Sequence, residues 1–243
     1  MLITVVNPNT TESMTATIAK AAAAVAGPGT TIRAATSRTG PASIESHYDE
    51  ALSVPGLLAE IAAGERAGSA GDVIACFGDP GLDAARELAG GPVVGIAEAA
   101  MRTASYLGRG FSVVTTLGRT VGRAHDLAAH YGAGRFCRGV HACEIPVLEL
   151  ETDPAARDRI TEDCRRAVAA DGSDAVVLGC AGMADLCAHI SAEIGVPVVD
   201  GVAAAVKAVE SLVALGLRTG DRGEFAAPPA KAYTGMLSEF QIP

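Results

Sequence analysis

The chain has 243 residues, of which 19 are basic and 28 acidic, giving a formal net charge of −9. This balance excludes the basic surface that nucleic-acid binding requires, and a content of 49% hydrophobic and 19% charged residues excludes a disordered chain. The length is sufficient to bury a large core without disulfide or metal cross-links.

Short β-branched runs, each followed by a turn and an Ala-rich helical stretch, predict the alternating strands and helices of an α/β protein. The first run begins at Ile3 with no basic leader before it, so we expect no secretory signal and a cytoplasmic protein. Strands are expected over residues 3–6, 73–77, 93–96, 111–115, 175–179 and 196–199.

The last expected strand opens the most apolar stretch of the chain, residues 196–217. Asp200, Lys207 and Glu210 interrupt this stretch, whereas a membrane span requires about 18 to 20 uninterrupted apolar residues. We therefore expect no membrane segment but a strand followed by a long helix, over about residues 204–217, that returns over the first half of the protein.

The expected strands form two sets of three, and each member of the first set recurs 103 to 110 residues later. From Asp72 the sequence reads Asp-Val-Ile-Ala-Cys-Phe-Gly, and from Asp174 it reads Asp-Ala-Val-Val-Leu-Gly-Cys-Ala-Gly. In each half Pro-Val-Val begins 16 to 17 residues after the cysteine. This repeat predicts two Rossmann-like βα lobes with mainly parallel sheets, related by a pseudo-twofold axis and separated by an active-site cleft.

The repeat also predicts how the chain is divided. We expect residues 1–98 and 206–243 to form the first lobe with a returning C-terminal segment, and residues 99–205 to form the second lobe. The tail from Ala226 is expected to lie extended on the surface or on a partner subunit. This tail and the apolar composition favour a homo-oligomer.

The six cysteines have neither C-x-x-C spacing nor another zinc pattern, so we expect free thiols and no metal site. Cys76 and Cys180 stand at equivalent places in the repeat, at the carboxyl end of a strand, where parallel sheets bind ligands. The other four have no counterpart in the repeat and are expected to be bystanders: Cys137, Cys143, Cys164 and Cys187.

Two equivalent thiols on opposite sides of a cleft suit the inversion of a stereocentre. A thiolate removes a proton from one face while the opposite thiol supplies a proton to the other, so the pair acts as general base and general acid. A helix N-terminus after each cysteine is expected to lower the thiol pKa toward neutrality. The backbone N–H groups of Gly78 and Gly182 are expected to stabilise the enolate oxygen. No cofactor is expected, because the sequence has neither a G-x-G-x-x-G turn after a strand nor a P-loop lysine.

Four motifs carry more specific information: Asn7–Thr10, Gly40–Glu45, Cys76–Asp83 and Gly179–Met183. On these motifs the chain resembles the aspartate/glutamate racemase superfamily and, within it, the hydantoin and allantoin racemases. The resemblance covers essentially the whole chain and implies a cofactor-independent racemase in which Cys76 and Cys180 are catalytic. It further implies substrate contacts at Asn9, Ile44, Gly78, Thr115, Thr116 and Gly182.

The chain departs from the amino-acid racemases of that superfamily directly after each cysteine. Those enzymes resemble it in fold but typically carry Asn-Thr and Thr-His there, whereas this chain has Phe77-Gly78 and Ala181-Gly182. Without those polar groups a charged amino acid would be poorly matched, whereas a neutral cyclic ureide brings its own N–H and C=O groups. We therefore expect a racemase of 5-monosubstituted hydantoins, allantoin included. An amino-acid racemase, a maleate-isomerase-like enzyme and a non-catalytic small-molecule binder remain alternatives.

Several polar residues near these motifs are expected to have structural roles. Asp79 is expected to cap a helix, Glu45 to be a helix-start carboxylate, and Arg119 and Arg123 to lie on a solvated face. The five histidines share no spacing with the two cysteines and are expected to be structural or on the surface.

Overall fold

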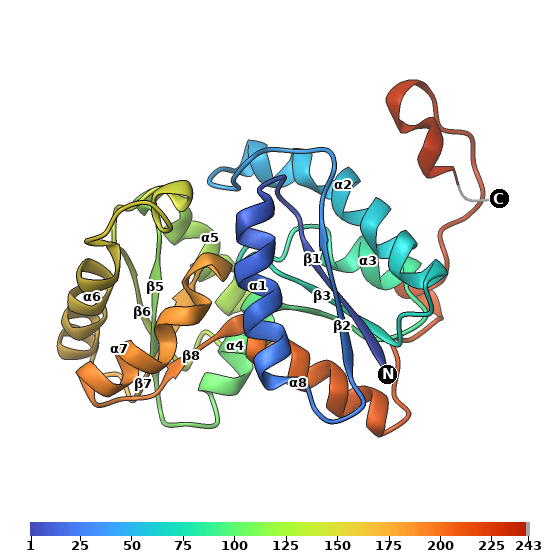
Figure 1. Cartoon of the computed structure of the whole chain (residues 1–243). Helices are drawn as coiled ribbons and strands as arrows, with labels where there is room; N and C mark the ends of the chain where they lie inside the picture. Colours follow the sequence, from blue (N-terminus) through green and yellow to red (C-terminus); the bar gives the residue numbers. More distant parts are fainter. Residues whose placement is uncertain (242–243) are drawn as a thin grey trace.

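The computed structural model describes residues 1–241 and contains two lobes, each built on a parallel four-stranded sheet (Figure 1). The first sheet has the order β2-β1-β3-β4 and the second the order β6-β5-β7-β8. The identical order in both halves confirms the predicted pair of pseudo-twofold-related α/β lobes. The strands are β1 (Leu2–Asn7), β2 (Thr31–Thr36), β3 (Gly71–Ile74), β4 (Val93–Gly95), β5 (Phe111–Thr115), β6 (Cys137–Ala142), β7 (Ala175–Gly179) and β8 (Val198–Val199).

Two of these strands, β2 and β6, were not expected from the sequence. They are equivalent in the two lobes, and each pairs on one side only, at an edge of its sheet. Both are partly exposed, unlike the buried edge strand β4, so they lack the apolar run that identifies a buried parallel strand. Arg33 in β2 and Arg138 in β6 interrupt the apolar pattern accordingly.

The ends of four expected strands also differ from the structure, and β1 is one residue longer than expected at each end. Strand β3 ends at Ile74 rather than Phe77, because the chain then turns and the N–H of Asp79 donates to the carbonyl of Cys76 at 3.0 Å. Strand β4 ends at Gly95, where a helix begins, and β8 starts two residues later than expected. Cys76 therefore lies in a turn beyond its strand.

Eight α-helices follow the eight strands in the described part of the chain, one after each strand. The final one spans Gly201–Ala214 rather than the expected 204–217, because the side chain of Asp200 caps it by accepting the N–H of Val202 at 2.8 Å. Gly216, with a φ of 70°, ends it in a left-handed turn. The helices are α1 (Glu12–Val25), α2 (His47–Arg66), α3 (Leu82–Leu88), α4 (Ile96–Ala104), α5 (Val121–His130), α6 (Ala156–Asp171), α7 (Cys187–Ile194) and α8 (Gly201–Ala214).

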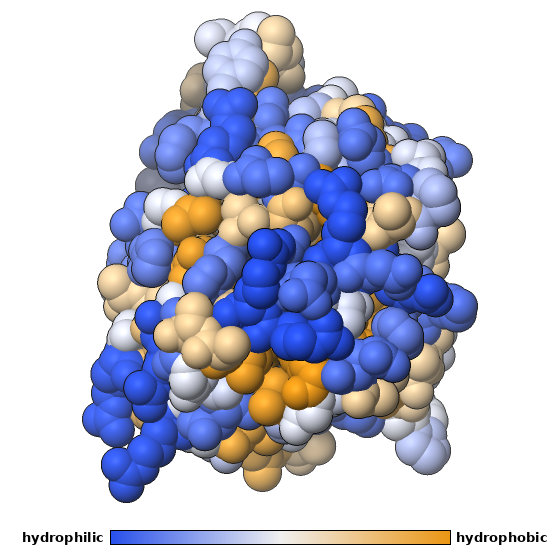
Figure 2. All heavy atoms as spheres, turned by 90° about the vertical axis from the view of Figure 1, so that its left-hand side faces the viewer, coloured by the Kyte–Doolittle hydropathy of each residue, from blue (hydrophilic) through white to orange (hydrophobic). Residues whose placement is uncertain are grey.

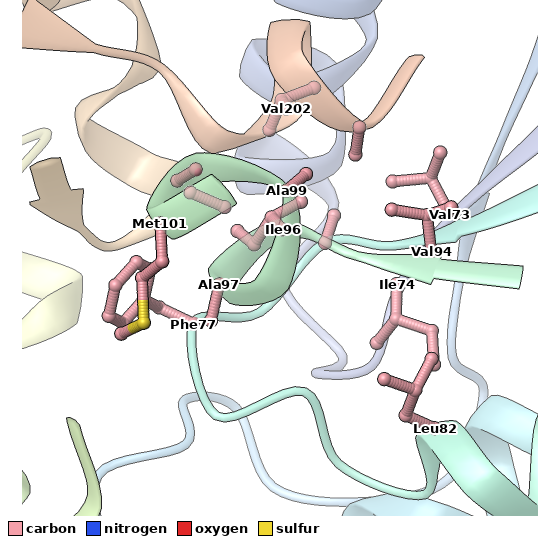
Figure 3. Packing of buried hydrophobic residues seen from close by; sticks show 14 of the residues in the cluster. Val73, Ile74, Phe77, Leu82, Val94, Ile96, Ala97, Ala99, Met101 and Val202 are labelled. Carbon is pink, nitrogen blue, oxygen red and sulfur yellow. The ribbon is translucent and has the colours of Figure 1, made fainter. Parts of the chain in front are cut away.

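The helices α4 and α8 tie the two lobes together. Helix α4 follows a strand of the first sheet but packs against β7 of the second, whereas α8 follows a strand of the second sheet but packs against β3 and β4 of the first. The two helices also pack on each other. Around α4, Ile96, Ala97 and Met101 lie among Phe77 and Val202, which come from both halves of the chain (Figure 3). One apolar cluster therefore spans the two lobes, and a second cluster, which includes Val114, Ile160 and Leu178, lies within the second lobe.

The expected division of the chain stays a prediction. Both of its boundaries, 98/99 and 205/206, fall inside the crossing helices α4 and α8. The tail leaves α8, contacts α3 through the short 3₁₀ helix η4 (Gly223–Phe225), and ends in η5 (Gly235–Phe240) away from the two lobes (Figure 1).

The outer face of the second lobe carries many hydrophilic side chains, with a smaller apolar area in its lower part (Figure 2). Within α6, arginine–carboxylate pairs such as Arg165–Glu162 and Arg166–Asp163 contribute to this polar surface. Among residues 1–241, no helix has the length and apolar character needed to span a membrane.

Candidate active site

The candidate active site is a cavity of about 160 Å³ at the carboxyl ends of the central strands of both sheets. A cavity of about 150 Å³ accommodates a molecule the size of benzene, so this one suits a small ring compound. Its walls contain both proposed catalytic cysteines and five of the six expected substrate contacts. These are Cys76, Cys180, Asn9, Ile44, Gly78, Thr115 and Thr116.

Cys76 and Cys180 occupy equivalent positions in the two lobes. Cys76 lies two residues beyond the end of β3, and Cys180 directly follows β7. Both thiols are half-buried and border the same cavity. They are close enough that the charge of an ionised Cys180 would raise the pKa of Cys76. The geometry therefore brings together the two thiols that the repeat paired in the sequence.

The prediction that helix N-termini lower the thiol pKa is wrong for this structure. Burial raises the pKa of both Cys76 and Cys180 to about 12, because the surrounding protein disfavours the charged thiolate. Helix α3 begins only at Leu82, beyond the turn that follows Cys76, so its N-terminus is not adjacent to that cysteine. Cys180 precedes only the 3₁₀ helix η3 (Ala181–Leu186).

Backbone N–H groups lower the pKa of both thiols and so oppose the effect of burial. A hydrogen bond from the backbone of Gly78 lowers the pKa of Cys76, and one from Gly182 does the same for Cys180. Gly78 and Gly182 are thus directed at the sulfurs, where they were expected to hold an enolate oxygen. Gly182 also differs in position: it does not line the cavity and lies beside the side chains of Leu150 and Met14.

Asn9 is held in a fixed orientation by the loop that follows β1. Its Oδ1 accepts a hydrogen bond from Nδ2 of Asn7 at 2.8 Å and another from the N–H of Thr11 at 2.9 Å. Its Nδ2 faces the sulfur of Met14, a weak acceptor, at 3.1 Å. Because both Asn9 and Met14 line the cavity, Nδ2 is the atom of Asn9 that is suited to donate to a ligand.

Thr115 is the last residue of β5, in the second lobe, and Thr116 directly follows it. The hydroxyl of Thr115 pairs with that of Thr120 at 2.9 Å. The backbone carbonyl of Thr116 accepts the N–H of Ile145 at 3.1 Å, which fixes this end of the strand. Both threonines are buried at the cavity wall.

A polar rim around the cavity was not identified from the sequence. Glu45 accepts the N–H of Val147 at 2.7 Å and so joins the loop before α2 to the second lobe. Glu50 pairs with Arg123 at 2.6 Å, and Arg123 also donates to the carbonyl of Gly78 at 2.8 Å. The cavity wall includes these three side chains together with His47 and Arg119.

The role expected for one of these rim residues, Arg123, is therefore wrong. Arg123 joins the two lobes rather than lying on a solvated face, whereas His47 and Arg119 are exposed at the border of the cavity. Sequence position was the available signal. Glu45 ends the Gly40–Glu45 motif, His47 lies two residues after it, and Arg123 lies seven residues after Thr116. Desolvation by burial raises the pKa of Glu50, and the charge of Arg123 opposes this effect.

Asp79 has the capping role that was expected, although it caps α4 rather than the helix that follows it. Its two carboxylate oxygens accept the N–H groups of Ala97 and Glu98 at 3.0 and 2.9 Å. Within residues 1–241, no group of three or more His, Cys, Asp and Glu side chains is arranged to hold a metal ion.

Comparisons with known proteins show which family the chain belongs to. Residues 3–209 match the family model described as Asp/Glu/Hydantoin racemase. The chain is 49% identical to a hydantoin racemase of Rhizobium meliloti over 97% of this chain and 98% of that protein. An allantoin racemase from Klebsiella pneumoniae is 52% identical, with a TM-score of 0.97 and 99% of each chain covered. The crystal structure of an allantoin racemase from Pseudomonas fluorescens is 41% identical, with a TM-score of 0.90, and covers 97% of this chain and 100% of its own.

Proposed function

Because the chain belongs to the Asp/Glu/hydantoin racemase family, we propose that Cys76 and Cys180 are the proton-transfer groups of a hydantoin or allantoin racemase. The protein is a racemase and hence an isomerase. One observation carries the assignment of residues: two thiols at equivalent ends of β3 and β7 border a single cavity.

The reaction needs a base on one face of the substrate and an acid on the other. The thiolate of one cysteine takes the proton from C5 of the ring, and the electron pair of that C–H bond passes into the neighbouring carbonyl to form an enolate. The thiol of the other cysteine then gives its proton to the opposite face of C5, so the enolate becomes the inverted product and that cysteine becomes a thiolate. The two cysteines exchange roles for the reverse reaction.

The walls of the cavity support a neutral ring as the substrate. The Glu50 carboxylate is paired with Arg123, so this ion pair presents little net charge to a ligand. Nδ2 of Asn9 is suited to donate to a ring carbonyl, and the buried threonines supply hydroxyl groups. A 5-monosubstituted hydantoin offers the complementary C=O and N–H groups and needs no buried counter-charge.

A chiral assay without added cofactor tests the proposed function. The purified protein is incubated with single enantiomers of allantoin, 5-benzylhydantoin and 5-isobutylhydantoin, and optical rotation is followed beside an enzyme-free control. We expect at least one compound to racemise, and Cys76→Ser and Cys180→Ser each to abolish the enzymatic rate. Unchanged rotation for all three compounds, or full activity in either variant, would contradict the proposal.

A homo-oligomer is a further part of the proposal. The end of the tail carries Met236, which is 90% exposed, and Leu237 and Tyr233 are also exposed, as is typical of a segment that packs on another subunit. Light scattering of the full chain during size-exclusion chromatography is expected to give a mass above that of one chain, and a monomer would refute this part. The cytoplasmic location stays a prediction.

A further inference from the structure

The turn that carries Cys76 contains a strained residue. Asp79 has a φ of 45°, in the left-handed region that residues other than glycine rarely adopt. Its N–H closes the turn on the carbonyl of Cys76 at 3.0 Å, and its side chain is buried. Such a conformation persists only where the surrounding contacts hold it in place.

The contacts that hold Asp79 come from elements of both lobes. Oδ1 accepts the N–H of Ala97 and Oδ2 accepts the N–H of Glu98, both at the start of α4. The hydroxyl of Tyr131, which follows α5 of the second lobe, donates to Oδ2 at 2.7 Å. At Gly95 a Cβ atom would lie 2.2 Å from Cγ of Asp79, so this close approach requires glycine.

Among the residues that the structure describes, the second lobe has no equivalent of this side-chain anchor. Helix α8 occupies the place in the second half that α4 occupies in the first, and its cap is Asp200, the residue directly before it. The turn after Cys180 is closed in the same way, by the N–H of Met183 on the carbonyl of Cys180 at 3.2 Å, but it continues into η3 and carries the apolar Met183 where the first lobe has Asp79. The two cysteine turns are therefore related by the repeat but are supported differently.

We propose that Asp79, held by Tyr131, is a positioning residue that fixes the Cys76 turn against both lobes and makes Cys76 and Cys180 non-equivalent. It does not touch the substrate. It sets where the Cys76 sulfur stands relative to the cavity. The catalytic consequence rests on the proposed racemase function, because misplacing a proton-transfer group by about 1 Å can cost about 100-fold in rate.

The test compares the two thiols within one molecule. Full-length Asp79→Asn, Tyr131→Phe and the matched cap variant Asp200→Asn are treated with iodoacetamide at pH 8, and alkylation of Cys76 and Cys180 is followed separately by mass spectrometry. In Asp79→Asn, an amide NH₂ replaces one acceptor oxygen, so the turn loosens and loses a negative charge near Cys76. We expect alkylation of Cys76 to accelerate at least about threefold relative to Cys180.

The kinetic readout uses whichever ureide the wild type racemises. We expect kcat of Asp79→Asn to fall at least about tenfold while KM changes less than about threefold. Tyr131→Phe, which removes a single hydroxyl, should change both readouts in the same direction by less. Asp200→Asn should leave the ratio of Cys76 to Cys180 alkylation unchanged.

An unchanged alkylation ratio in Tyr131→Phe and in any folded Asp79→Asn would overturn the proposal, as would an equal change in Asp200→Asn. If Asp79→Asn does not fold, Tyr131→Phe decides. If the alkylation ratio shifts but the wild type racemises no ureide, the proposed function fails while the positioning role of Asp79 stands.

Discussion

At the two cysteines, burial and hydrogen bonding have opposite effects on the thiol. Burial raises the pKa of each to about 12, and the backbone hydrogen bonds from Gly78 and Gly182 act against it without cancelling it. Both side chains are therefore thiols in the unliganded protein at neutral pH, and only a small fraction is thiolate. This condition suits a pair in which one member must remain protonated while the other is ionised.

The raised thiol pKa predicts how activity depends on pH. Because the thiolate fraction grows about tenfold for each pH unit below the pKa, kcat/KM should rise steadily from pH 6 to pH 9 without a plateau near pH 7. The measurement is a pH–rate profile with the uncatalysed racemisation subtracted at each pH. A plateau that begins below pH 8 would indicate a thiol pKa much lower than the structure implies.

The pairing of Glu50 with Arg123 makes a second residue-scale prediction. In Arg123→Gln the carbonyl of Gly78 loses a donor, and the Glu50 carboxylate is left unpaired close to Cys76, where its charge raises the thiol pKa. We expect kcat/KM to fall about tenfold, and Glu50→Gln in the same chain to recover part of that loss. Steady-state kinetics of the two single variants and the double variant measure this coupling; strictly additive effects would argue against it.

The sequence predicted where the two cysteines lie but not the polar rim of the cavity, for a physical reason. Cys76 and Cys180 follow recognisable buried strands, so the repeat places each cysteine at the carboxyl end of a central strand of its sheet. Glu50 and Arg123 meet only because α2 of one lobe and α5 of the other face the same cavity. The relative placement of two lobes is not encoded in any local pattern.

At the scale of elements, the crossing helices α4 and α8 join the lobes through one shared apolar cluster. Their first residues approach each other closely, because a Cβ on Gly201 would lie 2.7 Å from the backbone oxygen of Ile96. The sequence predicted the central strands of both sheets and the edge strands β4 and β8. The β2 and β6 edges were missed because a half-exposed strand tolerates Arg33 or Arg138.

This close approach predicts a stability effect. Gly201→Ala should force α4 and α8 apart and lower the free energy of unfolding by about 1–3 kcal/mol, which corresponds to a Tm loss of about 2–4 °C per kcal/mol. Thermal unfolding followed by circular dichroism measures the change. Gly122→Ala is the matched control, because the helical Gly122 has no neighbour within 4 Å; it should stabilise slightly. Equal Tm values for Gly201→Ala and the wild type would refute the tight crossing.

At the scale of the whole molecule, buried carboxylates link stability to pH. Burial raises the pKa of Asp72 to about 7, and the pKa values of Asp79 and Asp200 to about 6. At pH values between the ordinary carboxyl pKa and these raised pKa values, the three carboxyl groups bind more protons in the folded protein than in the unfolded chain. Stability from these groups is therefore present at low pH and is lost as the pH rises through 6 to 7.

Asp72 offers the cleanest test of this linkage, because it lies at the opposite end of β3 from Cys76. Its Oδ2 is buried without a hydrogen-bond partner, which disfavours the charged form. Asp72→Asn should raise the free energy of unfolding at pH 8 by about 1–3 kcal/mol and reduce the fall in Tm between pH 5 and pH 8. Urea unfolding at both pH values measures this; a variant that is less stable than the wild type at pH 8 would contradict it.

The central claim, that two opposed thiols transfer the proton, is tested most directly by racemisation in D₂O. One enantiomer of a turned-over ureide is incubated with the enzyme, and deuterium at C5 is measured in both enantiomers during the first few per cent of reaction. With two bases, the product should carry deuterium while the remaining substrate keeps its original hydrogen. Early deuterium in both enantiomers to the same extent would indicate a single exchanging base and would contradict the paired roles of Cys76 and Cys180.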